Sequence, residues 1–198
     1  MSHSHERRFD PADRAGLMDD ERRARWNPPH LLAVAGLRAG QTALDLGCGP
    51  GFWTLPMAEI VGTQGQVIAL DVSPEMLEAL VTEDPPAHVR LMQGELPAIN
   101  LPDASIDFIW AAFIFHEVEP PTALAVEMGR VLRSAGRIAV LDWRPDAQGP
   151  SGPPRAHRLS PQQVEEFLRA AGLIGIQRAW QDEDTYLLCT EQQNHPSK

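Results

Sequence analysis

The sequence predicts one α/β domain with a largely parallel sheet and helices on both faces. Between residues 42 and 142, short apolar runs of strand length alternate with segments whose apolar residues recur at helical spacing. Strands that alternate with helices form parallel sheets, because each helix carries the chain back to the edge where the previous strand began. The length of 198 residues fits a single domain, and an apolar fraction of 43% is sufficient for a hydrophobic core.

The alternating region supplies five strands and the helices between them. The strands are expected at residues 42–46, 66–71, 89–93, 106–113 and 138–142. The helices are expected at residues 52–61, from residue 73 to a stop at 84–86, and at residues 122–132. Ser73 followed by Pro74 predicts a helix start, because the serine oxygen accepts a first-turn amide and proline fits the first helical position.

A further helix and a hairpin are expected after the fifth strand. Ser160 and Gln163 have the spacing of a capping box, and the apolar residues that follow them recur at helical spacing. Two runs at residues 174–180 and 185–190 predict a closing antiparallel hairpin. The segment 144–158 is rich in Pro and Gly, and it is expected to be an irregular loop.

The chain is expected to consist of three parts. Residues 1–37 form an N-terminal helical cap, residues 38–190 form the ligand-binding domain, and residues 191–198 form a disordered tail. Within the cap, Pro11 and Asp13 suit a helix start. The cap is expected to cover the site rather than to fold as a separate domain.

The composition restricts the partners of the protein. A net charge of −10 and a pI near 5.1 disfavour nucleic acid, because phosphate binding needs clustered Lys and Arg. The sequence has no apolar run of about twenty residues and no apolar signal core, so no membrane span or export is expected. A cytoplasmic protein is predicted, in which Cys48 and Cys189 stay free thiols. The sequence leaves a monomer and a homodimer open.

The most informative stretch is a glycine-rich turn after the first strand. Residues 43–51 read Ala-Leu-Asp-Leu-Gly-Cys-Gly-Pro-Gly, in which Asp45 precedes glycines at every second position. Alternate glycines let the backbone approach a ligand closely, because no Cβ intervenes. A second acid, Asp71, ends the next strand, where a carboxylate can accept hydrogen bonds from both hydroxyls of a ribose. The two signals together predict a nucleotide-binding site.

These motifs resemble those of the class I S-adenosylmethionine (SAM) dependent methyltransferases. The family's first motif, acid-x-Gly-x-Gly-x-Gly, and three later motifs are similar to residues 45–51, 67–77, 101–109 and 130–137. The last of these departs from the family's Arg-Val-Leu-Lys-Pro-Gly-Gly pattern at Ser134 and Ala135. The resemblance covers about residues 38–190 and is greatest to small-molecule members of the ubiquinone/menaquinone methylase group. It implies a Rossmann-like seven-stranded sheet with an antiparallel last strand.

The resemblance also implies a set of SAM-binding residues. This set comprises Asp45, Gly47, Cys48, Gly49, Gly51, Phe52, Asp71, Val72, Met76, Glu95, Leu96, Ala112 and Phe113. The glycines pass under the amino-acid part of SAM, where Asp45 either faces the ammonium group or holds the turn. Asp71 binds the ribose, and Glu95 either accepts from the adenine amino group or is a solvated loop carboxylate. No Cys-x-x-Cys or His-Glu-x-x-His spacing is present, so no metal site is expected.

His116 and Glu117, which follow the fourth strand, are the candidate catalytic residues. Methyl transfer is an in-line displacement, and an acceptor hydroxyl or amine must also lose a proton, which histidine is suited to take near neutral pH. Glu117 is expected to orient the imidazole or to bind a cationic acceptor. The alternative is that His116 only caps a helix or packs against Phe115.

The sequence therefore predicts a methyltransferase that moves a methyl group from SAM to a small molecule and leaves S-adenosylhomocysteine (SAH). The acceptor atom, O, N or C, stays open. The alternatives are a SAM- or SAH-binding protein without transfer activity, and an NAD-dependent enzyme. NAD is disfavoured because Phe52 stands where the dinucleotide fingerprint has its third glycine. A DNA acceptor is disfavoured because residues 113–116 read Phe-Ile-Phe-His, not the Asn/Asp-Pro-Pro-aromatic motif of enzymes that methylate DNA amino groups.

Overall fold

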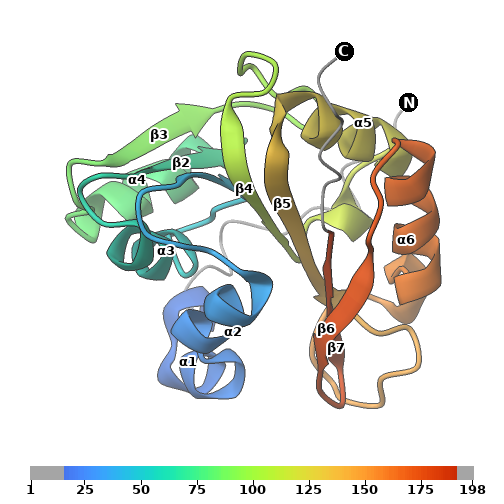
Figure 1. The fold of residues 1–198 in the computed structure, drawn as a ribbon. Helices are drawn as coiled ribbons and strands as arrows, with labels where there is room; N and C mark the ends of the chain where they lie inside the picture. The colour runs from blue at the N-terminus through green and yellow to red at the C-terminus, as the bar shows by residue number, and fades with distance from the viewer. Residues whose placement is uncertain (1–15, 191–198) are drawn as a thin grey trace, which may run out of the picture. The chain divides into compact units, whose positions relative to one another are not determined.

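The computed structural model describes residues 16–190, which cluster into two compact units. The N-terminal unit is described over residues 16–95 and the C-terminal unit over residues 96–190. The strands of the seven-stranded sheet have the order β3-β2-β1 in the N-terminal unit and β4-β5-β7-β6 in the C-terminal unit (Figure 1). Each unit therefore combines a sheet segment with its own helices.

The two ends of the chain lie outside this description. The helix start expected at Pro11 and Asp13 and the disordered tail expected at residues 191–198 are therefore not part of it. The division into a cap at residues 1–37 and a domain at residues 38–190 stays a prediction.

The N-terminal unit alternates helices with parallel strands. Its elements are α1 (Asp20–Trp26), α2 (Pro28–Ala35), β1 (Thr42–Leu46), α3 (Thr54–Val61), β2 (Gln66–Asp71), α4 (Pro74–Thr82) and β3 (Val89–Gln93). β2 pairs in parallel with β1 and with β3, and all three strands have the bounds that the sequence predicts. α3 packs against β1 and β2, and α4 packs against β2 and β3 (Figure 1).

Local chemistry explains where the elements of this unit begin. β1 and β2 are buried along almost their whole length, which is why apolar residues dominate both strands. The Ser73 side chain accepts the Met76 N–H at 3.2 Å, so the predicted start of α4 is confirmed. At the other end of the unit, the Asp19 side chain caps α1 by accepting the Arg22 N–H at 2.7 Å.

The C-terminal unit combines a parallel strand pair with a closing hairpin. Its elements are β4 (Ile106–Ala112), η3 (Phe115–Glu117), α5 (Pro121–Val131), β5 (Leu132–Trp143), η4 (Arg155–His157), α6 (Pro161–Ala170), β6 (Gln177–Gln181) and β7 (Thr185–Cys189). β4 and β5 are parallel, whereas β7 is antiparallel to both β5 and β6, so the antiparallel last strand is confirmed. The capping box of Ser160 and Gln163 is present in both directions, with contacts of 3.2 and 2.9 Å.

β5 begins six residues earlier than the sequence predicts, because a bulge lies near its start. Ile106 pairs with Leu132 and Phe108 pairs with Arg137, so two steps along β4 correspond to five along β5. A Cβ at Gly136 would lie 2.7 Å from the Leu132 side chain, which explains why the bulge uses a glycine. The bulge contains Arg133 and Ser134, and such polar residues do not indicate a strand in the sequence.

The residues of functional interest follow the carboxyl ends of parallel strands in each unit. In the N-terminal unit, the glycine turn follows β1, Asp71 ends β2, and Glu95 comes soon after β3. In the C-terminal unit, His116 lies in η3 soon after β4, and Asp142 lies at the end of β5. Ligands of open α/β sheets bind at this edge. Within residues 16–190, no helix has the length and apolar character needed to cross a membrane.

Candidate active site

The glycine turn has a backbone that ordinary residues avoid. Gly47, Gly49 and Gly51 have φ values of 66°, 53° and 101°, all in the left-handed region. A Cβ at Gly51 would collide with the Leu80 side chain of α4. Beside Gly49, by contrast, the nearest atom to such a Cβ is Leu17 Cδ1, at 3.8 Å. Gly51 is therefore required for packing, whereas Gly49 keeps an open backbone surface.

Asp71 fastens the glycine turn to the end of β2. Its Oδ2 accepts the Gly49 N–H at 2.8 Å, and its Oδ1 accepts the Ser73 N–H at 2.9 Å. Each carboxylate oxygen has a further lone pair, so the group retains the capacity to accept ribose hydroxyls. Burial raises the pKa of Asp71, and the backbone N–H donors only partly offset this. The link to Gly49 is a role that the sequence does not reveal, since the two residues are far apart in the chain.

Asp45 lies beneath the turn, where it is 1% exposed. Its Oδ2 accepts the Thr54 hydroxyl at 2.6 Å, which joins the end of β1 to the first turn of α3. Burial raises the pKa of Asp45 to about 7, against the opposing effect of the Thr54 hydrogen bond and with a further increase from Asp71. The contact with Thr54 is the turn-holding role that the sequence suggests, and contact with a ligand's ammonium group stays a prediction.

A cavity of about 340 Å³ lies at the ends of β2 and β3. Its lining consists of Val72, Gln93, Gly94 and Glu95. Val72 is 40% exposed there, which offers an apolar face, and Glu95 provides a carboxylate acceptor. An exposed apolar surface beside an acceptor fits an adenine ring with its amino group, and the neighbouring Asp71 fits the ribose. The expected contact of Leu96 falls in the other unit and stays a prediction.

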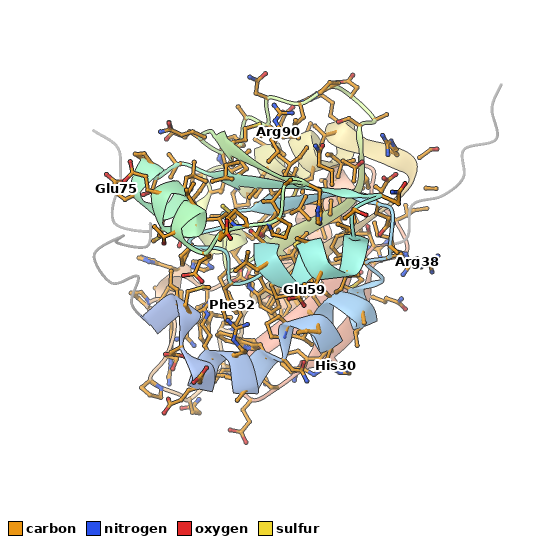
Figure 2. All side chains as sticks on the ribbon, turned by 90° about the vertical axis from the view of Figure 1, so that its left-hand side faces the viewer. His30, Arg38, Phe52, Glu59, Glu75 and Arg90 are labelled. Carbon is orange, nitrogen blue, oxygen red and sulfur yellow. The ribbon has the colours of Figure 1, made fainter. Side chains whose placement is uncertain are left out.

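Three of the predicted cofactor residues, Cys48, Phe52 and Met76, have largely buried side chains. Cys48 packs with Leu80 in a small core cluster, and burial raises the pKa of its thiol. Met76 is 4% exposed and lies in α4. Phe52, which Figure 2 labels, is 3% exposed. Its ring meets that of Trp26 in α1 edge-on, with the ring centroids 6.4 Å apart. Contact of these three residues with SAM stays a prediction.

The C-terminal unit contains a buried histidine–aspartate pair. His116 Nδ1 lies 2.7 Å from Asp142 Oδ1, and the two side chains are 4% and 0% exposed. The Glu117 carboxylate lies 4.0 Å from the other ring nitrogen, Nε2. This arrangement leaves Nε2 as the nitrogen available for proton exchange.

The pKa of His116 is raised above its ordinary value by the charges around it. Burial lowers this pKa and is the largest single influence, but the charge and hydrogen bond of Asp142 together outweigh it. Glu117 raises the pKa further, and Arg158 lowers it. The protonated form of the His116 imidazole is therefore more stable in this site than it would be in water.

Aromatic side chains lie beside this pair in the sequence. Phe113 has a φ of 60°, which is unusual for a large residue, and its ring centroid lies 5.1 Å from that of Trp143. The Arg158 guanidinium stacks 5.6 Å above the Trp143 ring and donates to three backbone carbonyls of the segment 144–158. Ala112 is 8% exposed at the end of β4. Strained backbone and fixed aromatic rings are common at functional sites.

The sequence does not reveal that Asp142 contacts His116. The sequence shows it only as an acid at the end of an apolar strand, and its partner His116 lies 26 residues earlier. Asp107, by contrast, forms an ion pair with Arg133 at 2.7 Å. Over residues 16–190, no three His, Cys, Asp or Glu side chains are grouped so that they could hold a metal ion.

Comparison with known proteins identifies the family. Residues 44–140 match the family described as a methyltransferase domain. A solved SAM dependent methyltransferase from Aquifex aeolicus is 31% identical and matches with a TM-score of 0.85, over 92% of this chain and 98% of that one. This chain belongs to the class I SAM-dependent methyltransferases. The predicted family, Rossmann-like fold and SAM cofactor of this methyltransferase are thereby confirmed.

Curated relatives of this methyltransferase are matched over part of their length. The ubiquinone/menaquinone biosynthesis C-methyltransferase UbiE of Marinomonas sp. is 32% identical over 124 residues, which are 60% of this chain and 49% of that protein. The demethylmenaquinone methyltransferase of Geobacillus sp. is also 32% identical over 124 residues, covering 61% and 53%. The chain thus spans about half the length of these curated relatives.

Proposed function

We propose that this chain transfers a methyl group from SAM to a small-molecule acceptor and releases SAH. The observation that carries the proposal is the hydrogen bond of 2.8 Å between Gly49 N–H and Asp71. This bond joins an open-backbone glycine turn to a carboxylate that is proposed to bind the ribose, in a chain whose family uses SAM. A metal ion has no part in the proposal.

Each half of the cofactor has residues that suit it. SAM supplies a methyl group on a positively charged sulfur, which leaves as a neutral thioether. The glycine turn gives backbone surface to the amino-acid part, and Asp71 gives hydrogen-bond acceptors to the ribose. Val72 and Glu95 line the cavity proposed for the adenine. Ala112 and Phe113 are proposed to exclude water from the reacting methyl group.

The proposed catalytic residues are His116 and Glu117. As the acceptor atom gains the methyl group, its proton passes to His116, and the electron pair of the broken carbon–sulfur bond stays on sulfur. Glu117 is proposed to favour the resulting imidazolium or to hold a cationic acceptor. A positioned base of this kind contributes typically about 10²- to 10⁴-fold to a rate.

The acceptor is proposed to be a small molecule in the cytoplasm. The net charge of −10 disfavours nucleic acid, and Cys48 and Cys189 are both free and buried, as expected for a reducing compartment. The matched relatives named demethylmenaquinone methyltransferase make reduced demethylmenaquinone the first acceptor to test.

The test combines binding with transfer. Calorimetry with SAM, SAH and NAD would measure affinity, and methyl-labelled SAM with reduced demethylmenaquinone or a small-molecule cell extract would reveal product. We expect micromolar or tighter binding of SAM and SAH, no binding of NAD, and labelled product. Binding of SAM without any labelled product would support the alternative of a binding protein. Binding of NAD in place of SAM would overturn the proposal.

A further inference from the structure

We propose that Asp142 is a positioning residue for His116, which it holds so that Nε2 takes the proton of the methyl acceptor. The inference rests on the proposed function, since it deepens the role given there to His116. It stands on the contact of 2.7 Å between His116 Nδ1 and Asp142 Oδ1, in which both partners are almost completely buried.

The geometry fixes Asp142 more firmly than it fixes the histidine. Asp142 Oδ1 also accepts the N–H of Trp143 at 2.8 Å, so the carboxylate is tied to the backbone at the end of β5. His116 lies in the short helix η3, which follows β4 after a strained residue at Phe113. A rigid strand therefore holds the acid, and the acid in turn determines the orientation of the imidazole.

The second carboxylate oxygen strengthens the argument. Asp142 Oδ2 is buried, and no atom of residues 16–190 donates a hydrogen bond to it. A buried carboxylate with so few donors is poorly stabilised as an anion, so it gains most from a neighbouring positive charge. Protonation of His116 supplies that charge within hydrogen-bonding distance. A carboxylate used only to cap backbone groups would not need to lie opposite a titrating ring.

The position of each proton during the reaction follows from this arrangement. Nδ1–H donates to Asp142 throughout, which leaves the lone pair of Nε2 as the only basic site on the neutral ring. The acceptor atom gives its proton to Nε2 as it gains the methyl group. The imidazolium is stabilised by Asp142 and, at 4.0 Å, by Glu117, while the charge of Arg158 opposes it. Release of the proton to water restores the neutral ring.

The experiment reads the tautomer and titration of His116 by nuclear magnetic resonance of protein labelled with ¹⁵N-histidine. The full chain is used without donor or acceptor, and His116→Gln assigns the signal among the seven histidines. We expect the neutral ring of the natural protein to carry its proton on Nδ1. In Asp142→Asn, the midpoint of the titration should fall markedly, whereas it should fall less in Glu117→Gln.

Asp107→Asn is the matched control, because it removes an equal charge from β4 in an ion pair with Arg133, and it should leave the midpoint unchanged. A proton on Nε2 in the natural protein would overturn the inference, and this result needs no variant to fold. An unchanged midpoint in folded Asp142→Asn would overturn it as well.

In the transfer assay, the kcat of Asp142→Asn should be lower by about 10²-fold or more, and its Kd for SAM should be unchanged. Failure of the proposed function would instead show as no transfer by the natural protein, with the tautomer as expected.

Discussion

Each of the two units contains buried acids at the ends of strands, and the two units differ in the groups that bind these carboxylates. In the N-terminal unit, Asp45 and Asp71 are bound by a hydroxyl and by backbone N–H groups, which are permanent donors. In the C-terminal unit, Asp142 lies opposite a histidine, and one of its oxygens has no donor among residues 16–190. Fixed donors suit a binding cradle that must keep its shape, whereas a titrating partner suits proton transfer.

The largest expected effect is the loss of SAM binding at the glycine turn. Gly49→Val should abolish measurable SAM binding, because a branched side chain would occupy the open face of a turn with φ of 53°. Gly40→Val is the matched control, since Gly40 has φ of 78° and free space around it before β1. Both variants carry the backbone strain of a left-handed valine, about 1–2 kcal/mol. Calorimetry should show SAM binding only in the control. Equal binding by both variants would contradict the proposal that the glycine turn binds SAM.

A large effect confined to turnover is expected from the other unit. His116→Gln should reduce kcat about 10²- to 10⁴-fold, because no other group takes the acceptor proton. Its Kd for SAM should stay within about twofold of the natural protein's value, because the glycine turn and Asp71 lie in the N-terminal unit. Initial rates with labelled SAM and calorimetry on the same preparation would separate the two quantities. Unchanged turnover would leave His116 as a packing residue.

A moderate effect on affinity is expected when the turn is loosened. Asp71→Asn keeps the shape of the side chain but leaves one oxygen to serve both Gly49 and Ser73. Loss of a hydrogen bond to a charged group costs about 1.5–3 kcal/mol, which corresponds to roughly 10- to 100-fold in Kd. Glu59→Gln, an exposed charge on α3 (Figure 2), controls for the change in net charge. If Asp71→Asn bound SAM as tightly as this control, the ribose assignment would be wrong.

A further effect is expected on how the free energy of unfolding depends on pH. The pKa of Asp45 is about 7 in the folded chain against an ordinary 3.8, so folding favours the protonated acid. This contribution is complete below about pH 4 and is lost as the pH rises through 7, and its size is about 4 kcal/mol at most. Asp45→Asn removes it, while Asp71 and His116, which titrate in the same direction, remain. Urea unfolding at pH 5 and pH 8 should therefore show a smaller decrease for Asp45→Asn than for the natural chain. Equal decreases would contradict the raised pKa.

Much of the fold follows from local patterns. The three strands of the N-terminal unit match their predicted bounds. β1 and β2 are buried and mainly apolar, which makes them easy to delimit in the sequence. The start of β5 was predicted wrongly, since the bulge near Gly136 places polar residues inside a strand. No local pattern signals a bulge that depends on the pairing with β4.

For the candidate site, the sequence by itself determined the chemical groups and their order along the chain. The alternate glycines and the acids Asp45 and Asp71 are visible as spacings and as family motifs, and His116 and Glu117 are visible as a polar pair after the fourth strand. Only the tertiary structure decided which groups touch, because hydrogen bonds over 22 and 26 residues depend on how strands are paired. The supply of donors is likewise decided by the packed chain: each Asp71 oxygen accepts a backbone N–H, whereas Asp142 Oδ2 has no donor among residues 16–190.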